Sequence, residues 1–119
     1  MEKFIINGGI PLNGEMTPSG NKNAALPLLA ACLLTAEPVT LHNVPDILDV
    51  RAMIKLLKSL NVKIEKTDES SYRLDAGDIR PPDLDPDLCR KIRASILLAG
   101  PLLSRVGEIY LPPPGGDVI

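Results

Sequence analysis

The sequence predicts a mixed α/β fold, and three observations support this prediction. Segments with helical hydrophobic spacing alternate with short strand-like runs, and polar turns separate some of these runs into hairpins. Hydrophobic residues make up 45% and charged residues 24% of the 119 positions, so the chain can bury a core. Aromatic residues make up only 3% and Trp is absent, so the core has to be aliphatic.

The first part of the chain is expected to contain a hairpin, a helix and a strand. These are a hairpin formed by residues 3–6 and 10–16, a helix over residues 21–34 and a strand over residues 39–44. Ser19 is suitably placed to cap the helix. Pro27 lies within its early turns and removes one helical hydrogen bond, so we expect a kink there or a late helix start.

An amphipathic helix is expected after Pro45. Asp46 can cap this helix, and Asp49 lies in its first turn, where the helix dipole favours an acidic side chain. Lys55 and Lys58 lie off its apolar face. The residues of that face are spaced three or four positions apart: Ile47, Val50, Ile54, Leu57 and Leu60.

A second hairpin and a third helix are expected next. The hairpin is predicted from two alternating segments, residues 62–65 and 72–75, which flank a polar turn. The helix is expected over residues 87–104 with a kink at Gly100-Pro101, and a strand over residues 108–111. The buried stripe of this helix is expected to comprise Leu88, Ile92, Ile96, Ala99 and Leu103.

The order of these elements suggests a repeated unit. Residues 12–75 follow the pattern β-α-β-α-β-β, and the next segment begins with another helix and strand. Because the sequence stops just after a glycine-rich loop, we expect it to be part of a longer chain.

Composition and charge exclude several classes of protein. The net charge of −2 and the scarcity of aromatic residues argue against a general nucleic-acid binder. The longest apolar run, residues 24–34, is too short to span a bilayer, and no signal peptide is visible. Cys32 and Cys89 form neither a disulfide framework nor a zinc site, so we expect two small core residues in a cytoplasmic protein.

Two basic segments could hold an anionic ligand. Lys22 and Asn23 lie at a predicted helix N-terminus, where unpaired N–H groups favour phosphate or carboxylate; a solvated lysine on a capped helix is the alternative. Arg93 borders a predicted apolar stripe, where a guanidinium can be held rigidly to grip a phosphate. A surface salt bridge is its alternative role.

A third candidate, Asp117, follows Gly115-Gly116 near the end of the sequence. A carboxylate on such a loop can act as a general acid if burial or negative neighbours raise its pKa, and a polar turn is the alternative. His42 is expected to be structural, because no catalytic partner is evident in the sequence.

The amino-acid sequences of four segments, and their order along the chain, indicate a protein family more specifically than any single residue does. The run SGNKNAALP at residues 19–27 resembles the opening signature of the UDP-N-acetylglucosamine enolpyruvyl transferases, within the EPSP synthase superfamily. The segment at residues 43–50, the run RASIL at residues 93–97 and the loop from Leu111 to Gly116 resemble later segments of the same family. The resemblance covers the whole chain.

The resemblance implies an inside-out α/β barrel, in which each of two domains contains three β-α-β-α-β-β units. Residues 1–20 would belong to a domain completed by chain beyond residue 119, and residues 21–119 would be the incomplete first half of the other domain. The implied activity transfers the enolpyruvyl group of phosphoenolpyruvate to the 3-hydroxyl of UDP-N-acetylglucosamine and releases phosphate. This is the first committed step of bacterial peptidoglycan (cell-wall) precursor synthesis, and it is expected to need no cofactor or metal.

The resemblance also implies roles for the candidate residues. Lys22 and Asn23 would contact phosphoenolpyruvate, and Arg93 would contact the UDP-sugar. Asp117 stands where the family usually has a cysteine, which donates a proton to the methylene carbon of phosphoenolpyruvate. A subset of the family carries Asp there, so activity need not be lost. The carboxylate should not form the stable thioether by which fosfomycin traps the cysteine, so we expect intrinsic resistance to that antibiotic.

Three alternatives remain open, one of which is a plain α+β binding domain whose resemblance to the family is accidental. The sister enzyme acting on shikimate 3-phosphate shares the lysine but usually has Ser-Lys-Ser where this chain has Asn21-Lys22-Asn23. A catalytically silent homologue with a binding or regulatory role is the third. Residues 1–119 alone are expected to show no turnover, since the family's second domain lies beyond them.

Overall fold

The computed structural model describes residues 2–80 and 84–116, which form helices packed against one face of a small sheet. The elements in chain order are α1 (Lys22–Ala31), the 3₁₀ helix η1 (Cys32–Leu34), β1 (Val39–Leu41), α2 (Leu48–Ser59), β2 (Lys63–Lys66), β3 (Tyr72–Asp75), α3 (Pro86–Lys91), the 3₁₀ helix η2 (Arg93–Leu98) and α4 (Ala99–Val106). The mixed α/β class is the one predicted.

Helix α1 starts one residue later than predicted and has a different cap. Asn21 is the N-cap, and its side-chain oxygen accepts a hydrogen bond of 2.7 Å from the backbone N–H of Asn23. The predicted cap, Ser19, lies outside the helix because the backbone turns into it only at Asn21. The helix continues through Pro27 to Ala31 and then tightens into η1.

Strand β1 is shorter than predicted, and the predicted cap of α2 is wrong. Beyond Leu41 the chain leaves the sheet, and Asn43 adopts a left-handed conformation with φ of 56°. The N-cap of α2 is Ile47, with no side-chain hydrogen bond. The carboxylate of Asp46 is instead bound by both Nε and an Nη of Arg51, at 2.6 and 2.8 Å, so it is not available to cap the helix.

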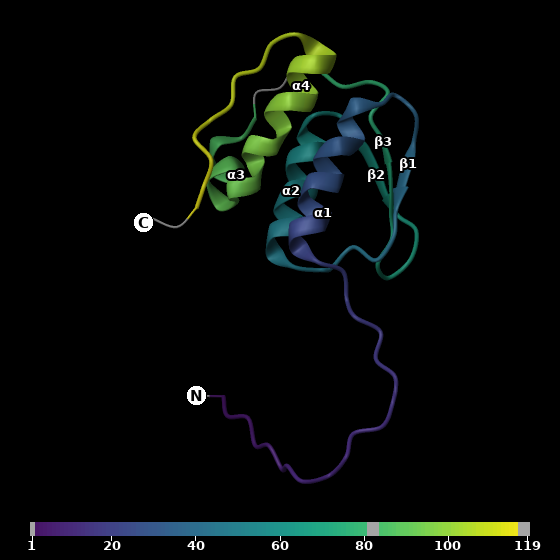
Figure 1. Ribbon diagram of the computed structural model, residues 1–119. Coiled ribbons are helices and arrows are strands. Elements are labelled where there is room, and N and C mark those ends of the chain that lie inside the picture. Colours follow the sequence, from purple (N-terminus) through teal and green to yellow (C-terminus); the bar gives the residue numbers. More distant parts are fainter. Residues whose placement is uncertain (1, 81–83, 117–119) are drawn as a thin grey trace.

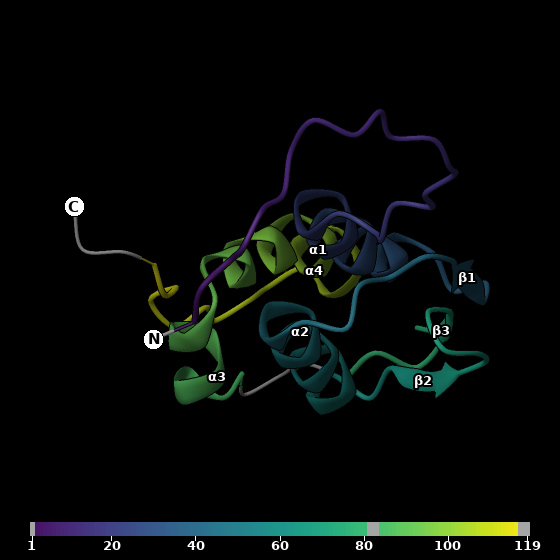
Figure 2. The same cartoon turned by 90° about the horizontal axis from the view of Figure 1, so that it is seen from below.

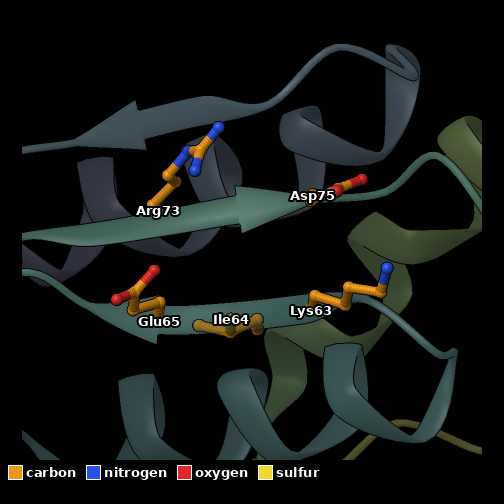
Figure 3. A pocket seen from close by; sticks show the side chains of 5 residues that line it. All are labelled: Lys63, Ile64, Glu65, Arg73 and Asp75. Atoms are coloured by element: carbon orange, nitrogen blue, oxygen red, sulfur yellow. The ribbon is translucent and has the colours of Figure 1, made fainter.

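The second hairpin is confirmed, and it forms the middle and one edge of a three-stranded sheet. The strand order is β1-β3-β2, with both pairs antiparallel. Figure 3 shows charged side chains of β2 and β3 on the outer face, where Lys63 lies opposite Asp75 and Glu65 opposite Arg73 in the register. Leu74 is buried against the helices. The alternation therefore places one face of the sheet on the core and the other in solvent.

The third helix is not continuous as predicted. It breaks at Ile92, whose backbone is extended (φ −138°, ψ 133°), and continues as η2 and α4. In an unbroken helix the carbonyl of Cys89 would accept from the N–H of Arg93. Here it accepts from the N–H of Gly115 at 2.9 Å and from the Oγ of buried Ser95 at 3.2 Å. Competing partners from inside and outside the segment therefore replace the helical hydrogen bond.

The break also changes which residues of this segment are buried. Ile92 is buried as predicted, but Ile96 and Leu103 are about half exposed, at 48% and 50%. The helix does not break at Gly100-Pro101, where a kink was expected. Pro101 lies in the first turn of α4, where a backbone N–H would have no helical hydrogen-bond acceptor, so the missing N–H of proline costs nothing there. The buried positions are Cys89, Ile92, Ser95, Leu98 and Leu102.

Two predicted strand regions are not strands in the part of the chain described. Residues 2–21 contain no strand, and Figure 1 shows this segment running away from the helices. Its apolar side chains are exposed, with Phe4 at 95% and Leu12 at 99%. Residues 108–111 also lack strand pairing. An isolated pair of strands is only marginally stable in water, and neither segment pairs with β1 or β2, the edge strands of the described sheet.

The core lies between the helices and the inner face of the sheet and is aliphatic, as predicted. Four residues of the predicted α2 stripe, Val50, Ile54, Leu57 and Leu60, are buried in it, while Ile47 is 36% exposed. The thiols of Cys32 and Cys89 are free and buried, and burial raises the pKa of both. No helix within the described ranges is long and apolar enough to cross a membrane.

Candidate functional site

Lys22 is the first residue of α1 and lies where the backbone N–H groups of the helix are unpaired. The Asn21 carbonyl accepts the first helical hydrogen bond from Ala25 at 2.9 Å, and the Asn21 side chain orients the N–H of Asn23. The helix N-terminus carries partial positive charge, to which the ammonium group of Lys22 adds. This end of the helix is therefore suited to a phosphate or carboxylate.

The ammonium group of Lys22 is held by Asp49, in the first turn of α2. Lys22 Nζ lies 2.9 Å from Asp49 Oδ2, and the two side chains are 51% and 36% exposed. A pair this exposed adds little stability. What it provides is position, because it directs a flexible lysine towards the start of α2. The sequence indicates both residues but not their pairing, because they lie on different helices and meet only when α1 and α2 pack together.

A second ion pair lies next to the first. Arg51 binds the carboxylate of Asp46 in bidentate fashion, and this hydrogen bonding lowers the pKa of Asp46 below its usual value. Lys22, Asp46, Ile47, Leu48, Asp49 and Arg51 line one open hollow of about 450 Å³. Both carboxylates in this hollow are paired with cations. An incoming anion would therefore compete with Asp49 for Lys22.

The segment just before Lys22 packs closely against the backbone of Asn43 at Gly20. A Cβ atom on Gly20 would lie only 1.7 Å from the carbonyl oxygen of Asn43. The segment around Asn43 is itself tied to the turn between β2 and β3. The N–H of Val44 donates to the carbonyl of Ser70 at 2.7 Å, and His42 Nδ1 lies 2.9 Å from Ser71 Oγ. The exposed His42 ring thus contributes to the contact between these two segments.

Arg93 is exposed and lies immediately after the break at Ile92. The buried hydroxyl of Ser95 stabilises this turn by donating to the carbonyl of Ile92 at 3.0 Å. The loop that leads to Gly116 packs alongside. A Cβ on Gly115 would lie 1.9 Å from the Arg90 carbonyl, and one on Gly116 would lie 3.7 Å from Arg93 Cδ.

The predicted site residues therefore fall into two groups. Lys22 lines the hollow at the start of α1 and α2, and the backbone of Asn23 lies in the same turn. Arg93 lies beside the loop of residues 112–116 and does not line that hollow. Asp117 lies outside the described residues. The structure thus brings Arg93 and the glycine pair together, and it adds Asp49, Asp46 and Arg51 to the surroundings of Lys22.

Comparison with known proteins assigns the chain to a family. The family described as EPSP synthase (3-phosphoshikimate 1-carboxyvinyltransferase) matches residues 6–119. The chain belongs to the EPSP synthase family. The matched range includes both groups of site residues, so Lys22 and Arg93 both lie within the family's own sequence pattern.

Curated relatives in the EPSP synthase family are similar along nearly the whole chain. A protein of Bradyrhizobium diazoefficiens is 56% identical over 98% of the chain, and one of Treponema denticola is 49% identical over all of it. A Treponema pallidum relative is 44% identical, again over the full chain. All three are named UDP-N-acetylglucosamine 1-carboxyvinyltransferase. The chain spans 27–28% of the length of these relatives.

A solved structure supports the same fold. The enolpyruvyl transferase NikO from Streptomyces tendae matches 84% of this chain with a TM-score of 0.70 and 27% sequence identity. The matched part is 23% of that chain. The predicted fold class, part of an enolpyruvyl transferase fold, is thereby confirmed.

Proposed function

We propose that this chain forms part of an enolpyruvyl transferase that moves the enolpyruvyl group of phosphoenolpyruvate to the 3-hydroxyl of UDP-N-acetylglucosamine. The observation that carries the proposal is the set of relatives with this name, which match 98–100% of the chain at 44–56% identity. The geometry around Lys22 supports it, because a cation at a helix N-terminus suits a phosphorylated substrate.

Lys22 and Asn23 bind phosphoenolpyruvate in this proposal. The ammonium group of Lys22 neutralises the phosphate and the charge that develops during addition. Its partner Asp49 keeps the ammonium near the helix N-terminus before substrate arrives, at 2.9 Å. A phosphate dianion then draws Lys22 away from Asp49, because the dianion offers more negative charge and the helix N–H groups bind it as well.

The reaction is an addition followed by an elimination. The sugar 3-hydroxyl adds to the carbon of phosphoenolpyruvate that bears the phosphate and gives its proton to a base in the part of the protein beyond residue 119, while Asp117 gives a proton to the neighbouring methylene carbon. The methyl group formed in this way then loses a proton to a base as the C–O bond to phosphate breaks, which leaves an enolpyruvyl ether and free phosphate. Arg93 binds the UDP-sugar, and its position beside Gly116 supports a role near the loop that carries Asp117.

The proposed protein has two domains, of which this chain supplies parts of both. Residues 1–20 join a domain completed by later chain, and residues 21–119 begin the other. The exposure of the apolar side chains of Phe4, Ile5 and Ile6, each above 85%, supports this, because such a segment needs a partner surface. Residues 1–119 alone then have no turnover, since the substrates need both domains around them.

The proposed protein acts in the cytoplasm on two small-molecule substrates and uses no cofactor. Its product enters the synthesis of peptidoglycan precursors, and so the protein supports cell-wall formation, cell shape and cell division. The sister reaction on shikimate 3-phosphate is the second candidate, because the family description names that activity.

The test is phosphate release by the full-length protein with phosphoenolpyruvate and either acceptor, UDP-N-acetylglucosamine or shikimate 3-phosphate. We expect release only with the nucleotide sugar, and loss of that release in Asp117→Asn. Release that survives Asp117→Asn would keep the enzyme but remove Asp117 as its acid. Release only with shikimate 3-phosphate would move the protein to the sister activity, and no release with either would favour a silent homologue.

Fosfomycin provides a second test of Asp117. We expect the full-length enzyme to keep its activity after preincubation with the drug, because a carboxylate does not form the stable thioether that a cysteine forms. Asp117→Cys is the matched control and should become sensitive. Time-dependent inactivation of the unaltered enzyme would contradict the proposed role of this position.

A further inference from the structure

A second hollow of about 440 Å³ lies between α2 and α3, which run side by side in Figure 2. Its size is within the range that accommodates a small organic ligand. The floor is apolar, because Ala52 and Ile92 are buried there and Leu88 is half-buried. This floor can accept a hydrocarbon chain or ring.

The walls of this groove carry an excess of positive charge. Three cations, Arg51, Lys55 and Lys91, and one acid, Asp49, line it, which leaves a formal excess of two positive charges (three minus one). Asp49 is already paired with Lys22, and Arg51 with Asp46.

Lys55 and Lys91 are the two cations left over. Neither makes an ion pair within residues 2–80 and 84–116, and both are exposed. They extend from different helices, α2 and α3, into one groove. Two lysines on opposite walls above an apolar floor match a ligand that has a doubly charged head and an apolar body.

We propose that the groove between α2 and α3 binds a small molecule that joins a phosphate dianion to an apolar chain or ring. Lys55 and Lys91 hold the phosphate, and Ala52, Leu88 and Ile92 contact the apolar part. The site is separate from the hollow at Lys22 and does not depend on the proposed reaction.

The two hollows nevertheless share one turn of the chain. Leu48, Asp49 and Arg51 line both. The Lys22→Gln variant is therefore needed in the test, to distinguish binding in the groove from binding at Lys22.

The test is calorimetric titration of the full-length protein with phenyl phosphate, which has both a dianionic head and an apolar ring. Benzyl alcohol and inorganic phosphate are titrated separately to divide the contributions of ring and charge. We expect Lys55→Gln/Lys91→Gln to weaken phenyl phosphate binding by at least tenfold. Lys58→Gln, an exposed lysine of α2 outside the groove, is the matched control and should change the affinity less than twofold.

Other outcomes would overturn the proposal. Binding that Lys22→Gln abolishes but the double variant leaves intact would place the ligand at Lys22 instead. Inorganic phosphate binding as tightly as phenyl phosphate would remove the role of the apolar floor. Absence of phenyl phosphate binding at millimolar concentration would mean that the groove is not a site for this class of ligand.

Discussion

Lys22 and Arg93 are both expected to bind substrate, but the chain holds them in different ways. The backbone at Lys22 is held by the start of α1 and by the close packing of Gly20 on Asn43, and the ammonium group pairs with Asp49 at 2.9 Å. Arg93 follows a break in a helix, and the loop that contains Gly116 packs beside it. The comparison suggests that Lys22 is pre-organised, whereas Arg93 can adjust to its ligand.

Removal of the pre-organised cation should have the largest effect. We expect Lys22→Gln to lower phosphate release by the full-length enzyme about 10²–10³-fold, because a fixed charge that faces a developing charge contributes that much to catalysis. Steady-state rates at saturating substrate would measure it. Lys58→Gln should leave the rate unchanged, and a loss below about tenfold for Lys22→Gln would mean that this lysine only binds substrate.

Disturbing the packing that positions Lys22 should have the next largest effect. We expect Gly20→Ala to lower the free energy of unfolding by about 1–3 kcal/mol, because its Cβ would lie 1.7 Å from the Asn43 carbonyl oxygen and the backbone must move.

The control for this prediction is Gly100→Ala in the first turn of α4, whose Cβ would have no neighbour within 4 Å. It should not lower stability, because alanine favours the helix more than glycine does. Urea unfolding of the full-length protein measures both variants. Equal stability of the two would show that the contact at Gly20 relaxes without strain.

A change at the adjustable cation should have a smaller effect that is confined to one substrate. We expect Arg93→Lys to raise the KM for the nucleotide sugar about tenfold and to leave kcat nearly unchanged, because lysine keeps the charge but loses the bidentate hydrogen bonds. Arg90→Lys is the control, since Arg90 is exposed and forms an ion pair with Asp87 at 3.1 Å. A fall in kcat alone would show that Arg93 acts in the transition state.

The smallest effect is expected at the ion pair beside Lys22. Arg51 lowers the pKa of Asp46, so the pair adds stability above the unfolded pKa of Asp46, about 4, and loses it as the pH falls through the lower folded value. Arg51→Gln should raise the pKa of Asp46 towards its ordinary value. NMR titration of the carboxyl carbon measures this, and an unchanged pKa would mean that the pair is not populated in solution.

Local sequence patterns were sufficient for the elements whose partners lie nearby in the chain. The stripe of α2 was predicted because its apolar residues recur with the helical period, and the hairpin of β2 and β3 because its segments alternate around a short polar turn. The start of α1 was predicted to within one residue, but its cap was predicted wrongly as Ser19 instead of Asn21. Lys22, Asn23 and Arg93 were chosen from their local setting and from family resemblance, and their roles remain predictions.

Other features depend on residues that are distant in the sequence. The break at Ile92 arises because Gly115 and Ser95 bind the carbonyl that a continuous helix would use. The pairing of Lys22 with Asp49 requires α1 and α2 to pack together, and residues 2–21 stay exposed because they pair with no strand of the described sheet. Periodicity and capping are short-range preferences, so they define helices and strands. Which hydrogen-bond partner or opposite charge a group finally takes depends on segments that are remote in the sequence and come together only in the folded structure.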